Sequence, residues 1–177
     1  EVIFAEVNAA VVGRLKIDHA YEVEGGGEHA VIEPVKNVSG IMSNDSAKIR
    51  EVGEHVSLIT MAVGPNVLKI IAKSIADIIK DRYSAGIKDE LNIIACENMV
   101  KGTSFLKENV FEYLSDEEKK YVDEYIGFPD SAVDRIVPPT SAVGKKVTYV
   151  MVEEFYEWIV DQSQIKGALD IKGMIKV

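Results

Sequence analysis

Short apolar, β-branched runs alternate along the chain with stretches in which apolar residues recur at helical spacing. The runs at 2–5, 56–60 and 92–96 predict buried strands, and the run at 132–137 predicts a further strand. A long helix is predicted after Gly64-Pro65, because one apolar stripe at helical spacing contains Val67, Leu68, Ile71, Ile75, Ile78 and Ile79. Strands that alternate with helices are typical of βαβ units, so the pattern predicts an α/β fold with a mostly parallel sheet.

Polar residues mark the starts of several predicted helices. Asn8 is placed to cap the first helix, and Ser46 to cap a short helix that ends near Val52. The run Ser115-Asp116-Glu117-Glu118 matches a capping box, in which a serine and a glutamate three residues later bond each other's backbone amides. A further helix is predicted from about 102 to 114.

Glycines separate two other apolar segments. Gly25-Gly26-Gly27 lies between 21–23 and 30–35, and this arrangement predicts a hairpin with a loose turn. The same glycines lie too far from a strand–helix junction to hold a phosphate group. Segments at 147–152 and 157–160 are also rich in apolar residues, but their pattern does not decide between strand and helix.

Composition restricts the possible partners. The chain has 177 residues, which fits a single domain over 1–177, and its 29 acidic and 20 basic side chains give a formal net charge of −9. Nucleic acid is an unfavourable partner for such a chain, because that interface needs clustered Lys and Arg. One cysteine excludes a disulfide framework, and no apolar run approaches the ~20 residues of a membrane span. We therefore expect a cytosolic protein.

The ends of the predicted strands hold the candidate functional residues, because ligands bind beyond the carboxyl ends of strands in open parallel sheets. Glu6 ends the first strand, where a carboxylate can accept the ribose hydroxyls of a dinucleotide. Small residues at 61–65 follow the next strand, and Glu97-Asn98 follows a third, where a carboxamide can donate to a reacting oxygen. The structural alternatives are a solvated carboxylate at Glu6 and an ordinary helix start at Gly64-Pro65.

The cysteine and the histidines do not indicate catalysis or metal binding. Cys96 has no base beside it in the sequence, so a small strand-end residue is favoured over a nucleophile. His19, His29 and His55 lack the paired spacing of metal ligands, and no metal is expected.

Longer segments carry a resemblance to a known family. The segments 4–8, 60–65, 91–100, 127–139 and 157–161 occur in the order and at the spacing found in the long-chain polyol-specific dehydrogenases, the family of the mannitol dehydrogenases. The run from Asn92 to Val100 is far more specific than an isolated glycine motif. The chain thus resembles this family over nearly its whole length.

The resemblance implies an NAD-dependent oxidoreductase. Members join an N-terminal Rossmann domain, which is doubly wound and binds NAD, to a helical C-terminal domain, and they oxidise a polyol carbon by hydride transfer without a metal. Blocks 92–100 and 130–139 favour the branch that interconverts mannitol 1-phosphate and fructose 6-phosphate. The alternatives are a mannitol 2-dehydrogenase or hexuronate reductase of the same family, or a nucleotide-binding module that does not catalyse.

The resemblance also assigns roles to individual residues, as follows. Glu6, with Asn8 beside it, would face the adenosine ribose and favour NAD over NADP, because a carboxylate repels a 2′-phosphate. Asn98 would hydrogen-bond the reacting oxygen, and Asp134 would organise polar groups near the active site. Arg135 would meet a substrate phosphate or form a structural salt bridge. The cofactor cleft would be lined by Ala62, Val63 and Gly64.

Two functional segments of the family are not matched by the chain. The glycine-rich phosphate loop of the family would precede Glu1. The general-base lysine of the family, with a partner asparagine and histidine, would follow Val177. We therefore expect a fragment that is catalytically inactive by itself. The first Rossmann strand would be missing from between the strands at 2–5 and 56–60, which predicts a rearranged sheet or strand exchange between chains.

Overall fold

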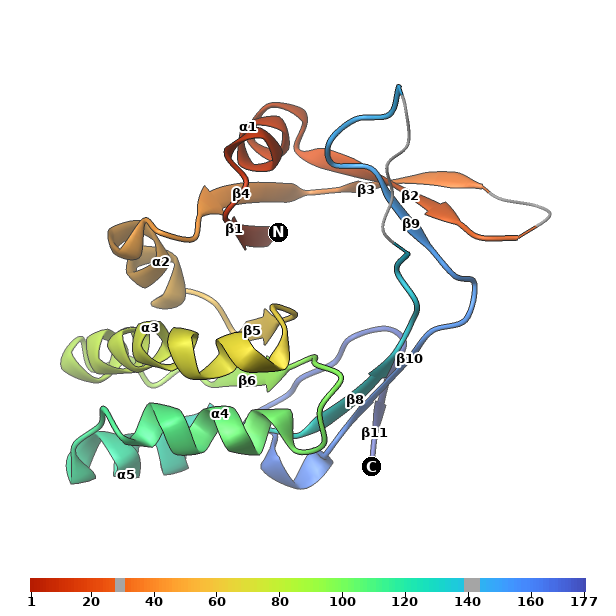
Figure 1. Cartoon of the computed structure of the whole chain (residues 1–177). Coiled ribbons are helices and arrows are strands. Elements are labelled where there is room, and N and C mark those ends of the chain that lie inside the picture. The colour runs from red at the N-terminus through yellow and green to blue at the C-terminus, as the bar shows by residue number, and fades with distance from the viewer. Residues whose placement is uncertain (28–30, 139–143) are drawn as a thin grey trace. The chain divides into compact units, whose positions relative to one another are not determined.

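The chain forms two compact units. The computed structural model describes residues 1–27, 31–138 and 144–177 (Figure 1). The first unit consists of Glu1–Ile49 and Asp134–Tyr156, and the second of Arg50–Val133 and Glu157–Val177. Strands and helices alternate along much of the chain, and most strand pairs are parallel. The predicted α/β class is thus confirmed.

A parallel strand pair and one helix form the first layer of the first unit. Strand β1 (Val2–Glu6) pairs with β4 (Val38–Met42), and α1 (Ala9–Asp18) packs on β4 through two buried side chains, Val12 and Leu15. Gly40 in β4 permits this contact, because a Cβ there would lie 3.2 Å from the Cα of Val12. The sequence analysis did not predict β4.

A hairpin and a third strand make up the rest of this unit. Strands β2 (Ala20–Gly25) and β3 (Ile32–Lys36) are antiparallel, as predicted, and β9 (Val150–Val152) pairs parallel with β2. Ala30, the first residue of the predicted second arm, lies outside the described residues. The undecided segment at 147–152 contains β9.

A three-stranded parallel sheet is the centre of the second unit. Strand β6 (Leu91–Ala95) lies between β5 (Leu58–Met61) and β7 (Ile126–Gly127), and all five of its residues are buried. Strand β5 pairs with residues 92–95 of β6, and β7 pairs with Leu91 and Asn92 on the other side. The apolar side chains of β6 on both faces require cover from other elements.

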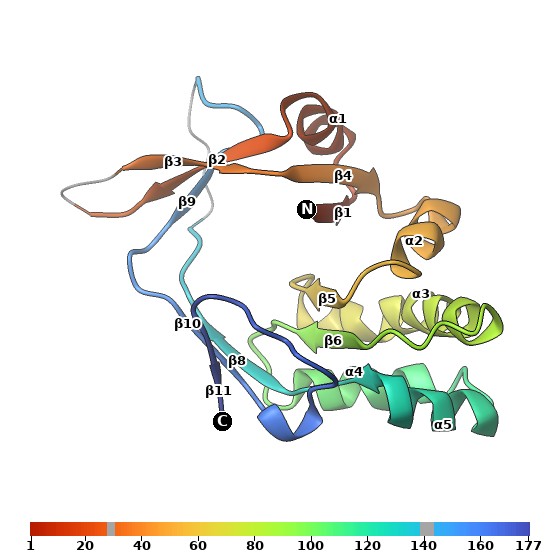
Figure 2. The ribbon, with the colours of Figure 1, turned by 180° about the vertical axis from the view of Figure 1, so that it is seen from behind.

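Helices cover one face of this sheet. Figures 1 and 2 show α3 (Pro65–Ser84) and α4 (Gly102–Phe111) on the same side of β5 and β6. The predicted stripe of α3 faces the interior, since Leu68, Ile75, Ile78 and Ile79 are buried. Helix α5 (Asp116–Tyr125) contacts α3 and β7, and it begins with the predicted capping box at Ser115 and Glu118.

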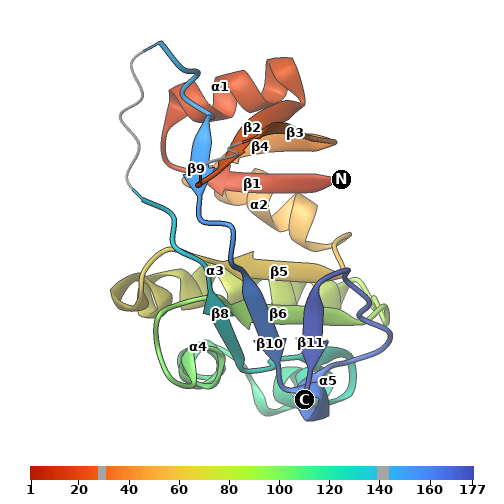
Figure 3. The same cartoon turned by 90° about the vertical axis from the view of Figure 1, so that its right-hand side faces the viewer.

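The C-terminal segment covers the other face. A second sheet is formed by β8 (Ser131–Asp134), β10 (Glu157–Val160) and β11 (Met174–Lys176). Figure 3 shows this sheet beside the central strands. The 3₁₀ helix η1 (Gln162–Gln164) follows β10. Ile94 of β6 packs there against a group that includes Val160, Leu169, Trp158, Ile165 and Ile171. The undecided segment at 157–160 is therefore the strand β10.

Helix α2 (Ser46–Gly53) differs from its prediction at its start. The Oδ1 atom of Asp45 accepts a hydrogen bond from the Lys48 amide at 3.0 Å, so Asp45 caps the helix and Ser46 is its first residue. The prediction of Ser46 as the cap is therefore wrong by one residue. A carboxylate at this position also has a favourable interaction with the positive end of the helix.

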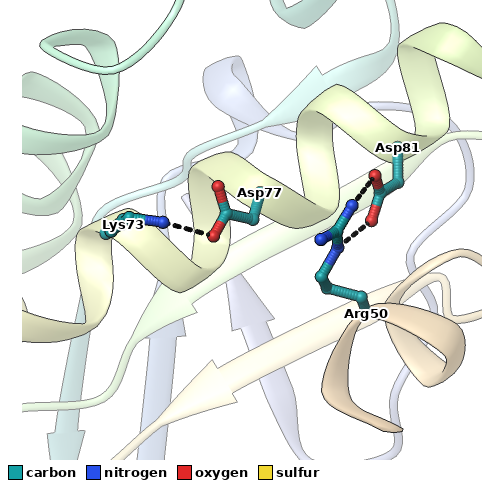
Figure 4. Close-up of polar contacts among 4 residues, drawn as sticks. All are labelled: Arg50, Lys73, Asp77 and Asp81. Carbon is teal, nitrogen blue, oxygen red and sulfur yellow. Dashed lines mark hydrogen bonds and ion pairs between the residues drawn. The ribbon is translucent and has the colours of Figure 1, made fainter. Parts of the chain in front are cut away.

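Two basic side chains connect α2 and the chain after it to α3. Arg50 of α2 forms a bidentate pair with Asp81 of α3 (Figure 4). The same figure shows an ion pair within α3, in which Lys73 and Asp77 lie one turn apart at 2.7 Å. Arg82 is almost fully buried, and its guanidinium donates to four backbone carbonyls. These are the carbonyls of Gly53 at 3.1 Å, Glu54 at 2.8 Å, Val56 at 3.3 Å and Asp89 at 2.6 Å.

Strands β1 and β5 each have one ladder among the described residues, β1 with β4 and β5 with β6. Val2 and Phe4 of β1 are 55% and 37% exposed, although residues 2–5 of this strand are apolar. An edge of this kind is a site of strand association. Strand exchange between chains stays a prediction.

Replacement of Arg82 by methionine should destabilise the chain strongly. The substitution keeps most of the volume but leaves four carbonyls without their donor, and we expect a loss of about 3 kcal/mol or more in the free energy of unfolding. Lys73→Met on the same helix removes only an exposed ion pair and should cost less than about 0.5 kcal/mol. Urea unfolding monitored by circular dichroism measures both, and equal losses would contradict the assignment.

The pair between Arg50 and Asp81 should make stability depend on pH. The hydrogen bonds from Arg50 lower the pKa of Asp81 below its ordinary 3.8. A lowered folded-state pKa gives stability that is fully present above the ordinary pKa and is lost as the pH falls through the lowered one. In a double-mutant cycle with Arg50→Met and Asp81→Asn, the coupling energy should therefore shrink below pH ~4. A coupling energy that stays constant in acid would contradict this.

Candidate functional site

The carboxyl ends of β5 and β6 lie side by side in the second unit. Met61 and Ala95 are partners in the parallel ladder, and the Cys96 amide donates to the Met61 carbonyl at 2.8 Å. The turns that contain Ala62–Gly64 and Glu97–Asn98 therefore leave the sheet from neighbouring strands at the same edge. Two of the candidate segments are thus brought together, as expected for a parallel sheet.

The turn after β5 is both a helix start and an open surface. Gly64 is the N-cap residue of α3 and has φ 93°, a conformation that glycine adopts without strain. Ala62 and Val63 are exposed, and a Cβ built on Gly64 would meet no atom within 4 Å. The helix-start alternative is therefore correct, and the same turn leaves room for a ligand next to the backbone.

Glu97 binds this turn from the neighbouring strand end. Its carboxylate accepts from the Val63 amide at 2.7 Å and from the Gly64 amide at 3.0 Å. Gly64 has no side chain for capping and Pro65 has no amide hydrogen, so Glu97 provides the negative charge at the start of α3. Sequence reasoning noted Glu97 only as the neighbour of Asn98 and did not assign it a role.

Asn98 lies in a turn that follows Ala95, and side-chain hydrogen bonds fix the backbone of Ala95. The Ala95 amide donates to Oγ1 of the buried Thr103 at 2.9 Å, and the Ala95 carbonyl accepts from Oγ of Ser131 at 3.0 Å. The Met99 amide closes the turn on the Glu97 carbonyl at 2.8 Å. The side chain of Asn98 is exposed on this turn.

Asp130 joins the start of α4 to the segment that holds Ser131. Its two carboxylate oxygens accept from the Ser104 amide at 2.9 Å and from the Ser104 hydroxyl at 2.6 Å. The carbonyl of Asp130 accepts from the Asp161 amide at 2.9 Å at the end of β10. Side chains of α4 and of the segment at Asp130–Ser131, together with the Asp161 backbone amide, thus fix the surroundings of the Asn98 turn.

Glu6 and Asn8 form a compact turn in the first unit. Oε1 of Glu6 accepts from the Val7 amide at 2.7 Å and the Asn8 amide at 2.9 Å. Oδ1 of Asn8 accepts from the amides of Ala10 at 3.0 Å and Val11 at 3.4 Å, which confirms the predicted N-cap of α1. The carboxylate of Glu6 is therefore held at the end of β1 through one of its two oxygens.

Asp134 and Arg135 follow one another at the end of β8. Both are exposed, and they belong to the first unit, whereas Asn98 belongs to the second. Nε of Arg135 donates to the Glu153 carbonyl at 3.3 Å, and the guanidinium lies 5.3 Å from the centre of the Tyr156 ring. Arg135 thus contacts a carbonyl and an aromatic ring within its own unit.

Cys96 is unsuited to act as a nucleophile. It is half-buried, and burial raises the pKa of its thiol to about 11. The reactive thiolate is scarce at neutral pH when the pKa is so high. Within residues 1–27, 31–138 and 144–177, no group of three or more His, Cys, Asp and Glu side chains is arranged to hold a metal ion. Across the same ranges, no helix is long and apolar enough to cross a membrane.

The alternating strands and helices, with turns that leave the carboxyl ends of parallel strands, are those of a Rossmann-type α/β domain. Residues 1–173 match the mannitol dehydrogenase Rossmann domain family, and the chain belongs to this family. The resemblance found in the sequence is thereby confirmed at the level of the family.

Two solved structures are similar to the chain in fold. A D-sorbitol dehydrogenase in substrate-free form matches with a TM-score of 0.80 and 14% identity over 99% of this chain and 46% of that one. The Pseudomonas fluorescens mannitol 2-dehydrogenase, in a ternary complex with NAD and D-mannitol, matches with a TM-score of 0.75 and 14% identity over 95% and 44%. The chain thus spans less than half the length of either protein.

Proposed function

We propose that this chain is the cofactor-binding domain of an NAD-dependent polyol dehydrogenase that interconverts mannitol 1-phosphate and fructose 6-phosphate. Family membership supports the general class of reaction. The observation that carries the proposal is the parallel pairing of β5 and β6, which places the open Ala62–Gly64 turn beside the turn of Asn98. A cofactor on the first turn would lie next to a carboxamide on the second.

Each unit has strand-end residues that suit part of a dinucleotide. Glu6 binds backbone amides through Oε1, so its Oε2 atom can accept hydrogen bonds from ribose hydroxyls. A Cβ at Gly64 would meet no atom within 4 Å, so a ribose or a nicotinamide ring could approach the backbone there. Ala62 and Val63 would line the same cleft. When bound, NAD⁺ accepts a hydride from the alcohol carbon of the substrate.

Asn98 would act on the substrate oxygen. Its exposed amide can donate to this oxygen, and such a bond strengthens as the hydroxyl loses its proton and negative charge develops. The proton would leave to a general base. Asp134 would order polar groups around the substrate. These roles use the side chains for orientation and charge stabilisation, and they need no covalent intermediate with the protein.

The phosphate on the substrate is the most specific part of the proposal. Blocks 92–100 and 130–139 resemble the branch of the family that acts on mannitol 1-phosphate, the mannitol-1-phosphate 5-dehydrogenases. Arg135 would contribute positive charge for the phosphate. A second candidate is a dehydrogenase for unphosphorylated polyols, which is favoured by the names of the two structural neighbours. Hexuronate reduction is a further alternative within the family.

Turnover with phosphorylated and unphosphorylated sugar tests the proposal. The full-length gene product should oxidise NADH with fructose 6-phosphate and not with fructose, and Asn98→Ala should lower kcat by about 10²–10³-fold. Asn44→Ala, an exposed asparagine of a turn in the first unit, serves as the matched control and should leave kcat unchanged. Turnover of fructose or hexuronates alone would favour the second candidate, and NADH binding without turnover of any sugar would indicate a non-catalytic module.

Glu6 should determine the choice of cofactor. Glu6→Gln keeps an oxygen that can accept from the Val7 and Asn8 amides but removes the charge that would repel a 2′-phosphate. We expect the ratio of kcat/KM for NADP⁺ over NAD⁺ to rise by about tenfold or more. Glu33→Gln, on the exposed strand β3, is the control. An unchanged ratio in both variants would exclude the role of Glu6.

A further inference from the structure

Glu97 connects two turns that are far apart in the sequence. Its carboxylate accepts from both amides of Val63 and Gly64, which lie 34 and 33 residues earlier in the chain. The contacts use both carboxylate oxygens, so they fix the orientation of the carboxyl group as well as its distance. A shift of the turn after β5 would therefore break charge-assisted hydrogen bonds.

The other end of this connection is equally constrained. Thr103 and Ser131 bind the amide and the carbonyl of Ala95, two residues before Glu97. The Cys96 amide is held by the ladder to Met61. The backbone just before Glu97 is thus fixed, so the carboxylate can hold the turn after β5 in place.

The hydrogen bonds of Glu97 also affect the position of Asn98. Asn98 directly follows Glu97 and lies in the same tight turn. Whatever fixes Glu97 relative to Gly64 also fixes the backbone of Asn98 relative to the Ala62–Gly64 turn. A misplacement of reacting groups by about 1 Å can cost about 10² in rate, so this spacing is important for hydride transfer.

We propose that Glu97 is a positioning residue that locks the turn after β5 to the turn of Asn98, and so sets the distance between the bound nucleotide and the substrate oxygen. The inference rests on the proposed function for its catalytic consequence. A neutral glutamine keeps one oxygen acceptor but not the charge opposite the start of α3, so it replaces Glu97 only in part.

Three variants of the full-length protein test the proposal: Glu97→Ala, Glu97→Gln and, as the matched control, Glu108→Ala. Glu108 is exposed on α4, the helix that follows the Asn98 turn. Hydrogen–deuterium exchange by mass spectrometry, on a peptide that includes residues 61–67, reports the lock itself. Calorimetry with NADH reports nucleotide affinity, and steady-state kinetics separate KM for NADH from kcat.

Glu97→Ala should increase exchange in this peptide, weaken NADH binding by about tenfold or more, and lower kcat. Glu97→Gln should lie between Glu97→Ala and wild type in all three measurements. A purely structural role would lower thermal stability without the graded change in NADH affinity and kcat. If Glu97→Ala does not fold, the comparison of Glu97→Gln with Glu108→Ala still decides.

The inference would be overturned if the exchange rate of the peptide and the NADH affinity of Glu97→Ala were within twofold of those of Glu108→Ala. This holds whether or not the protein turns over sugar. A wild-type protein that binds NADH but reduces no sugar would overturn the proposed function, and the exchange and affinity measurements would still decide whether Glu97 locks the turn. A wild-type protein that does not bind NADH would overturn both.

Discussion

The burial of strand β6 is the constraint on which the second unit depends. All five of its residues are buried, so its backbone needs a ladder on each side and its side chains need cover on each face. Strands β5 and β7 supply the ladders, helices α3 and α4 cover one face, and the C-terminal segment covers the other. At Ala95, where the ladder with β5 ends, Thr103 accepts from the amide and Ser131 donates to the carbonyl. The turn that follows therefore leaves the sheet in a fixed direction.

Carboxylates at helix starts are a recurring device in this acidic chain. Glu97 binds amides at the start of α3, Asp130 binds the Ser104 amide in the first turn of α4, and Asp45 caps α2. Each places a negative charge where unpaired amides and the helix dipole make the backbone positive. Glu97 and Asp130 come from distant segments, so they also connect elements that the sheet alone does not. Part of the net charge of −9 thus contributes to the fold.

The sequence predicted the elements with strong local signals and missed those that depend on packing. The α3 stripe, the Asn8 cap and the Ser115 capping box are local patterns, and the structure confirms them. Strand β4 was missed because Ser39 and Gly40 interrupt its apolar pattern, and Gly40 is required only because α1 approaches so closely. At the candidate site, the strand ends were predictable from fold rules. The role of Glu97 was not, because its partners lie more than 30 residues away.

The hydrogen-bonding capacity that remains on each candidate side chain separates structural roles from ligand roles. Asn8 has its side-chain oxygen engaged by two amides, so only its NH₂ group can contribute to a ligand. Glu97 engages both oxygens, which suits a positioning role better than direct contact with a cofactor. Glu6 engages one oxygen, so the turn at the end of β1 holds its charge in place while the other oxygen keeps its capacity to accept a hydrogen bond. Glutamates at the ends of β1 and β6 therefore differ in the hydrogen-bonding capacity that remains, and the backbone amides within reach of each carboxylate determine this difference.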